Sequence, residues 1–174
     1  MSCDISRGRL EPCKDSVGGL NAVYFVNKGD LGAITYDSTD TDVIDAVAGT
    51  PDAYKFDIKG ASTYTENITS SRENGTTTFE QVLELQLTKL TKEDHKTVKI
   101  LAFGSPSILV EDNNGNVFVA GLEHGLDVSG GTIVSGASMG DMSGYTLTFS
   151  GMEKAPANFL GDTISAVGFT VVLV

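Results

Sequence analysis

The sequence contains no tryptophan, two cysteines and two histidines, and each shortage argues against a class of site. Cys3 and Cys13, with only His95 and His124 to join them, lack the spacing of a structural zinc site. We expect two reduced thiols rather than a disulfide, because no secretion signal precedes them. The absence of tryptophan, with few aromatic residues overall, weakens a carbohydrate-binding interpretation.

Lysine and arginine are also scarce, at 12 against 23 Asp and Glu, for a net charge of −11. Proteins that wrap nucleic acid need clustered cations to displace phosphate counterions, so this balance argues against wrapping. An acidic surface still lets a duplex pass without adhering, although acids more often serve only solubility. No apolar run approaches the ~20 residues of a bilayer span, so we expect no membrane association. The start at Met1 does not resemble a signal peptide, so we expect use inside a cell or in an assembled particle.

Enzymatic chemistry has no recognisable constellation. The glycine-rich stretches 17–19 and 129–132 lack the Lys and Ser/Thr of a phosphate loop. Neither histidine is paired with a recognisable nucleophile, and both are expected to be structural or surface residues. The carboxylates Asp57, Glu66, Glu80 and Glu84 are expected on solvated strand faces rather than in a catalytic acid pair. We predict no enzyme, no catalytic residue, no metal site and no cofactor.

Alternation of apolar and polar residues predicts a long hairpin in the middle of the chain. Tyr54–Asn67 is predicted as a strand, 68–78 as an extended polar loop, and Phe79–Leu90 as a strand. Leu83, Leu85 and Leu87 fall on one face of that second strand. We expect the part Tyr54–Lys59 to pair with it, with charged residues gathered on one face.

A short helix is predicted to follow, at about 91–103. Thr91 can cap its first turn and Asp94 can reach back to it, as in a capping box. Val98, Leu101 and Ala102 form one narrow apolar stripe. Gly104 is expected to adopt the left-handed conformation that ends the helix, before Pro106.

A tight hairpin is predicted next, from two β-rich runs, Ser107–Glu111 and Asn116–Gly121, around an Asn-Gly pair. The oxygens at 112, 114 and 116 resemble those of a calcium loop. However, the glycine stands one place too early and no bidentate Glu closes the loop. We therefore predict a type I′ turn.

The remaining segments complete a mainly β chain with one helix. Further strands are predicted at 21–27, 32–36, 132–135, 144–150 and 168–174. The segment 37–51 is either a helical turn or a weak edge strand, and 152–162 is a turn or a single helical turn. Residues 1–20 form a polar arm that is either free or lies on a neighbour. The whole chain, 1–174, is expected to be a single domain.

The order of these elements resembles the tail tube fold. That fold is shared by tube proteins of long-tailed phages, contractile phage tails and the type VI secretion tube. The local sequence is also similar to tail proteins of phages that infect Bacteroidetes. The segments that carry the resemblance are 71–81, 90–96, 110–116 and 140–147. It implies a tail-tube-like β-sandwich or barrel.

The resemblance implies assembly rather than a reaction. Tube proteins form stacked hexameric rings around a lumen that conducts DNA without binding it specifically. The expected partners are therefore other copies of the chain and tail proteins such as the tape measure, terminator and baseplate. The expected location is the virion tail, after assembly in the cytoplasm of a host bacterium.

Alternation and loop length then suggest roles for individual residues. We expect the lumen to be faced by Asp57, Glu80 and Glu84. The expected contacts between subunits are Arg72, Glu73, Asn74 and Gly75, and those between rings are Arg7, Arg9 and Leu10. Two alternatives remain open: a tail terminator or head–tail connector that forms a single ring, and a capsid decoration or adhesin β-sandwich.

Overall fold

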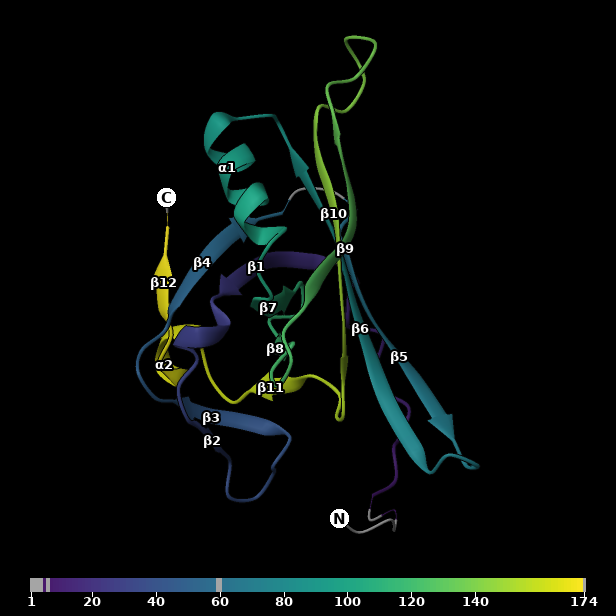
Figure 1. The fold of residues 1–174 in the computed structure, drawn as a ribbon. Coiled ribbons are helices and arrows are strands. Elements are labelled where there is room, and N and C mark those ends of the chain that lie inside the picture. Colours follow the sequence, from purple (N-terminus) through teal and green to yellow (C-terminus); the bar gives the residue numbers. More distant parts are fainter. Residues whose placement is uncertain (1–4, 6, 59–60, 174) are drawn as a thin grey trace.

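The structure, a computed structural model, describes residues 5, 7–58 and 61–173, and the chain is mainly β with two helices (Figure 1). The predictions for Cys3, Lys59 and Val174 therefore lie outside the described residues. The elements in chain order are β1 (Leu20–Val26), η1 (Lys28–Asp30), β2 (Ile34–Tyr36), β3 (Val43–Val47), β4 (Asp52–Asp57), β5 (Thr63–Ser71), β6 (Thr76–Thr88), α1 (Lys92–Leu101), β7 (Ser107–Asp112), β8 (Val117–Ala120), β9 (Asp127–Val134), β10 (Gly144–Glu153), β11 (Asn158–Leu160), α2 (Ile164–Val167) and β12 (Thr170–Val172).

The strands form two sheets. The larger, sheet A, has the order β12-β4-β1-β7-β8-β11-β3-β2, and the smaller, sheet B, has the order β5-β6-β10-β9. Sheet B is antiparallel throughout, whereas sheet A contains two parallel pairs, β12 with β4 and β11 with β3. Figure 1 shows sheet B as a tall layer beside the curled sheet A, with α1 near one end of both.

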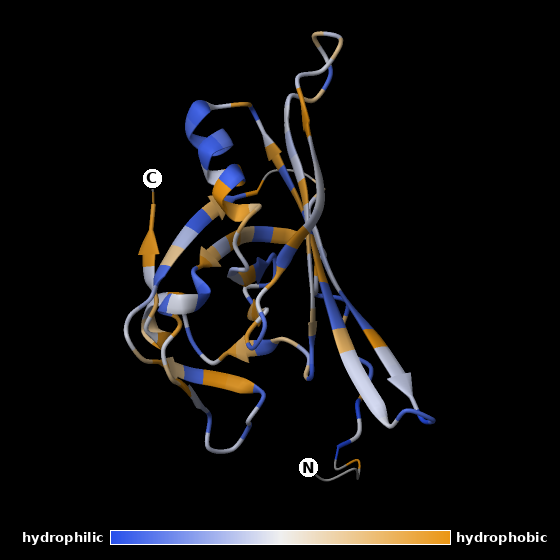
Figure 2. Cartoon of the chain, in the orientation of Figure 1, coloured by the Kyte–Doolittle hydropathy of each residue, from blue (hydrophilic) through white to orange (hydrophobic). Residues whose placement is uncertain are grey.

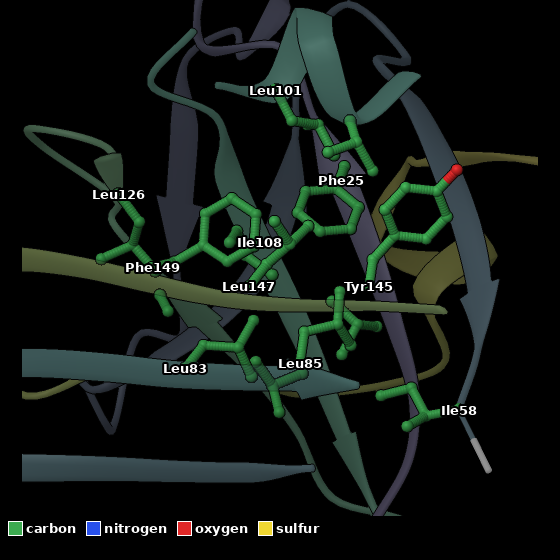
Figure 3. Close-up of a cluster of buried hydrophobic side chains, with 14 residues drawn as sticks. Phe25, Ile58, Leu83, Leu85, Leu101, Ile108, Leu126, Tyr145, Leu147 and Phe149 are labelled. Atoms are coloured by element: carbon green, nitrogen blue, oxygen red, sulfur yellow. The ribbon is translucent and has the colours of Figure 1, made fainter. Parts of the chain in front are cut away.

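The main core lies between the two sheets. Sheet B contributes alternate residues of β6 and β10, including Leu83, Leu85 and Phe149, all fully buried. Sheet A contributes Phe25 and Ile108 from its facing side, and Figure 3 shows these side chains interdigitating. The prediction that Leu83, Leu85 and Leu87 fall on one face of their strand is therefore confirmed, and that face packs on the main core.

A second core lies on the opposite face of sheet A. It combines Tyr24 of β1 with Ile44 of β3, although three strands separate β1 from β3 in the sheet. Sheet A must therefore curl so that its far end faces its middle, with Ile164 and Val167 of α2 enclosed in the curl. The segment 37–51 thus supplies an internal strand, and the expectation of a helical turn or an edge strand is wrong.

The helix α1 is the closest match between pattern and structure. The Thr91 hydroxyl oxygen accepts a hydrogen bond from the Asp94 amide at 3.0 Å, and the same hydroxyl donates to the Asp94 carboxylate at 2.6 Å. The Tyr145 hydroxyl donates to the Thr91 carbonyl at 3.2 Å, which ties the start of the helix to β10. Val98 and Leu101 are buried against the main core. Gly104 does not take a positive φ, so that part of the prediction is wrong, and the helix ends in right-handed backbone at Ala102.

The predicted long hairpin pairs different strands from those expected. The segment 54–67 contains two strands: β4, which pairs with β1 and β12 in sheet A, and β5, which pairs with β6 in sheet B. Alternation reports which residues share a face and carries no information about the partner strand, which is why this error arose.

The predicted extended loop at 68–78 is mostly strand. The β5–β6 ladder continues from Ile68 opposite Phe79 to Ser71 opposite Thr76, so only the four residues 72–75 turn. This stretch is exposed on both faces and is therefore rich in threonine and serine, a composition that is also typical of loops. Threonine is nevertheless β-branched and suits a strand.

Three further local predictions need correction. The β7–β8 turn has positive φ at Gly115 only, so it is not type I′, which requires positive φ at both central residues. The segment 152–162 contains the end of β10 and the strand β11 rather than a helical turn. The short helix α2 was not predicted, and its four residues are too few to show a periodicity.

Candidate functional site

The outer face of sheet B is a broad polar surface without cations. Direct cross-strand partners share a face, so the register assigns to this outer face Thr63, Thr65, Asn67, Thr69, Ser71, Thr76, Thr78, Glu80, Val82, Glu84, Gln86, Thr88, Asp127, Gly130, Thr132, Val134, Gly144, Thr146, Thr148, Ser150 and Met152. None of these described positions is Lys, Arg or His. The ends of β5 and β6 nearest their connecting turn are accordingly near-white in Figure 2.

Three carboxylates lie at these positions: Glu80 and Glu84 of β6, and Asp127 at the start of β9, which accepts from the Ser105 hydroxyl. Glu80 accepts a hydrogen bond from the Asn67 side chain at 3.4 Å, and Glu84 is exposed between Thr63 and Thr148. No described cation pairs with either glutamate. They therefore give this face a negative charge that no neighbouring side chain neutralises.

Asp57 does not belong to this surface. It lies on β4 opposite Ala22, on the face of sheet A that points away from sheet B, and it pairs with Lys55 at 3.0 Å. It lines a cavity with Gln86 and Thr88 at the end of β6, where β4 of sheet A approaches sheet B. The expectation that Asp57 shares one face with Glu80 and Glu84 is wrong, because Asp57 belongs to a different sheet.

Sheet B also has two long edges without a partner strand. β5 extends over nine residues and β9 over eight, and each pairs on one side only among the described residues. Neither strand contains the lysine or proline that commonly protects an exposed edge. The edge strands of sheet A, β2 and β12, have only three residues each. Sheet B is therefore the part of the fold best suited to accept a further strand on each side.

The two ends of sheet B carry projecting turns. At one end, residues 72–75 form the β5–β6 turn, in which the Asn74 amide donates to Ser71 at 3.3 Å and all four residues are exposed. At the other end, the loop 135–143 projects beyond the sheet and exposes Met139 completely. The Asp141 carboxylate orders this loop by accepting from the amides of Ala137 and Ser138 at 2.9 and 2.7 Å. These amides, that of Ser138 first, lower the pKa of Asp141.

The loop 135–143 also contains a Gly-x-Ser-x-Gly pentapeptide, 136–140, so the sequence does hold one serine in the setting of a hydrolase nucleophile. In hydrolases this motif turns sharply from a strand into a helix. Here it joins two strands, β9 and β10, and the Ser138 hydroxyl donates to Asp141 at 3.0 Å. The pentapeptide therefore forms a turn rather than a nucleophile elbow.

The N-terminal arm is attached at its last residues only. Val17 exchanges two hydrogen bonds with the Asn114 side chain, at 2.9 and 2.8 Å, and Asn113 donates to Gly18 at 2.9 Å. The residues before this attachment are exposed, with Leu10 at 92%, and those described form no helix or strand. Arg7, Arg9 and Cys13 are exposed with them, and Cys13 is a free thiol.

Among the described residues one cluster has the composition of a metal site: Glu123, His124 and Glu153. Glu153 is 5% exposed, and one of its oxygens accepts from the amides of Glu123 and His124 at 3.1 and 2.8 Å. Its other oxygen lies 3.0 Å from His124 Nδ1, and Lys154 lies 3.4 Å from Glu123. The carboxylate thus holds the β8–β9 connection in place, and its existing bonds account for its burial.

No family model, curated protein or solved structure matches the chain. No helix among the described residues is long and apolar enough to cross a membrane.

Proposed function

We propose that this chain is a structural virion protein, the major tube protein of a phage tail, which forms stacked rings around a lumen that conducts DNA. One observation carries the proposal. Sheet B combines two long edges free of lysine and proline, of which β9 contains a bulge, with an outer face that has no cations among the described residues. The first property favours joining copies side by side, and the second suits a wall past which DNA moves.

Ring closure follows from pairing β5 of one copy with β9 of the next. A four-stranded sheet repeated in six copies would close a barrel of roughly 24 strands, and the join would leave no edge exposed. With strands ~4.8 Å apart and tilted by ~40°, the backbone circle would be roughly 45–50 Å across. This leaves an open channel after side chains are added, as in large barrels.

The outer face of sheet B becomes the lumen wall in this arrangement. Glu80 and Glu84 face the lumen, surrounded mainly by threonine and serine, and Asp57 does not. A ring of six would carry a formal charge of roughly −66. Without lysine or arginine on the wall, no counterions are released by contact, and DNA passes without adhering.

The projecting parts then serve contacts between copies. The turn 72–75 and the arm residues Arg7, Arg9 and Leu10 are exposed and lie outside both cores, so they are free to contact adjacent subunits or rings. The ends of such a tube would meet other tail proteins, such as the tape measure, terminator and baseplate proteins. The protein would thus act in the virion tail, after assembly in the host bacterial cytoplasm.

Electron microscopy of the concentrated protein tests the proposal. Tubes of indefinite length are expected. Isolated rings would favour a terminator or connector, and monomers or trimers would favour a capsid decoration protein or adhesin.

Proline variants at the open edge link the result to sheet B. Adjacent amides of a strand point in opposite directions, so one of Thr69→Pro and Ser70→Pro removes a donor from the open edge of β5. That variant should keep the monomer fold by circular dichroism and lose ring formation. If both variants assemble like the unaltered chain, β5 is not a joining edge.

A further inference from the structure

The helix α1 presents an exposed stripe of cations and apolar side chains. Lys92, Lys96, Lys99 and Phe103 follow one another at spacings of four, three and four, which places them on one side of the helix and its terminal turn. Phe103 is 86% exposed, and Ile100 beside it is 63% exposed. The buried residues of α1 lie on its opposite side, so this stripe contributes nothing to the core.

The three lysines of the stripe have no acidic partner among the described residues, where ion pairs involve only Lys55, Lys154 and His124 as cations. Glu93 and Asp94 are near the start of the helix, but Asp94 is bonded to Thr91. In a chain with a net charge of −11, a cluster of unpaired lysines beside two exposed apolar side chains is unusual. Such a surface is suited to bind a partner that carries acidic and apolar side chains.

The β2–β3 turn of the same chain has the complementary chemistry. From Gly29 to Tyr54 there are six aspartates and no lysine or arginine. Asp37 accepts from the amides of Thr39 and Asp40 at 2.7 and 3.0 Å, and Asp40 accepts from the amide of Asp42 at 3.1 Å. These bonds order the turn within the single chain, before any partner binds. They also lower the pKa of Asp37, which favours its ionised form. Tyr36, 41% exposed, adds an aromatic ring at the base of the turn.

The stripe and the turn lie at opposite ends of the molecule. α1 follows the end of β6 at Thr88, which pairs with Gly144 at the start of β10. β10 runs to the other end of sheet B, and β11, which follows it, pairs with β3. Figure 1 accordingly shows α1 and the β2–β3 hairpin at opposite ends of the same side.

We infer that the exposed face of α1 binds the β2–β3 turn of a second copy of this chain, stacked above it in the next ring. The inference rests on the proposed tube and identifies the contact that stacks its rings. Asp40 and Asp42 meet Lys96 and Lys99, and the aromatic ring before the turn packs on Phe103. Because the two surfaces differ and lie at opposite ends, the contact repeats without closing and extends a tube indefinitely.

Charge exchange tests this contact. Lys96→Glu/Lys99→Glu turns the attraction into repulsion, so at ~50 mM salt the critical concentration for tubes should rise by about tenfold while rings still close. Asp40→Lys/Asp42→Lys should have the same effect. A chain that carries all four changes restores opposite charges across the contact at unaltered net charge, and it should form tubes again. Because these lysines are exposed, Lys96→Gln/Lys99→Gln provides a milder variant should the glutamates disturb the helix, as circular dichroism would show.

The controls separate stacking from ring formation. Lys28→Glu/Lys154→Glu changes the net charge equally at sites outside the stripe and should stack normally. Tubes of unaltered length from the helix variants at low salt, or no recovery in the fourfold variant, would overturn the docking while ring closure stands. If the unaltered chain forms no rings, the proposed function fails and this inference with it.

Discussion

The assignment of residues to the two faces of β6 can be tested by comparing two neighbouring residues. Leu83 is fully buried between its cross-strand neighbours Tyr64 and Phe149, whereas Val82 points to the outer face and is half-buried. Leu83→Ala removes three carbons from a site whose neighbours are rigid rings. The cavity should collapse poorly, and the loss should be about 3 kcal/mol in the free energy of unfolding. Val82→Ala should cost less than about 1 kcal/mol.

Urea denaturation of the monomeric proline variant provides the assay, since assembly would otherwise add to the apparent stability. At this chain length, about 3 kcal/mol corresponds to a fall in melting temperature of roughly 6–12 °C. If Val82→Ala is the more costly change, β6 is shifted by one residue. Glu80 and Glu84 would then face the core, which would refute the placement of the lumen wall.

Three other predictions concern the outer face and the loops. Glu153→Leu removes the buried acceptor of the backbone amides of the exposed residues Glu123 and His124 and should cost about 1–3 kcal/mol in urea denaturation; a loss below about 0.5 kcal/mol would exclude this carboxylate as the support of the loop. The amides lower the pKa of Asp141 in the folded protein, so its contribution to loop order is complete above its ordinary value of 3.8 and is lost as the pH falls through the lower folded value. The protection of the Ser138 amide, which is its intrinsic exchange rate divided by the measured rate at the same pH, should therefore persist at pH 5 and be lost only in stronger acid, and Asp141→Ala should remove it at both. Glu80→Lys/Glu84→Lys should leave rings intact and slow DNA ejection; unchanged ejection would count against a lumen position.

The sequence by itself determined the features that depend on neighbouring residues. The helix α1 is specified by residues that are close together in the sequence, namely the cap formed by Thr91 with Asp94 and the buried pair Val98 and Leu101. The tight β7–β8 hairpin follows from its Asn-Gly turn. The burial of Leu83 and Leu85 follows from alternation with period two, because successive side chains of a strand must point to opposite faces.

The tertiary structure alone decided which strands pair. β4 and β5 are nearly continuous in sequence but join different sheets, and β12 returns from the end of the chain to pair with β4. Such pairings depend on burial shared by residues far apart in the chain, which no local pattern records. For this reason alternation identified Glu80 and Glu84 as outward-facing and placed Asp57 on the same strand pair, although Asp57 belongs to a different sheet.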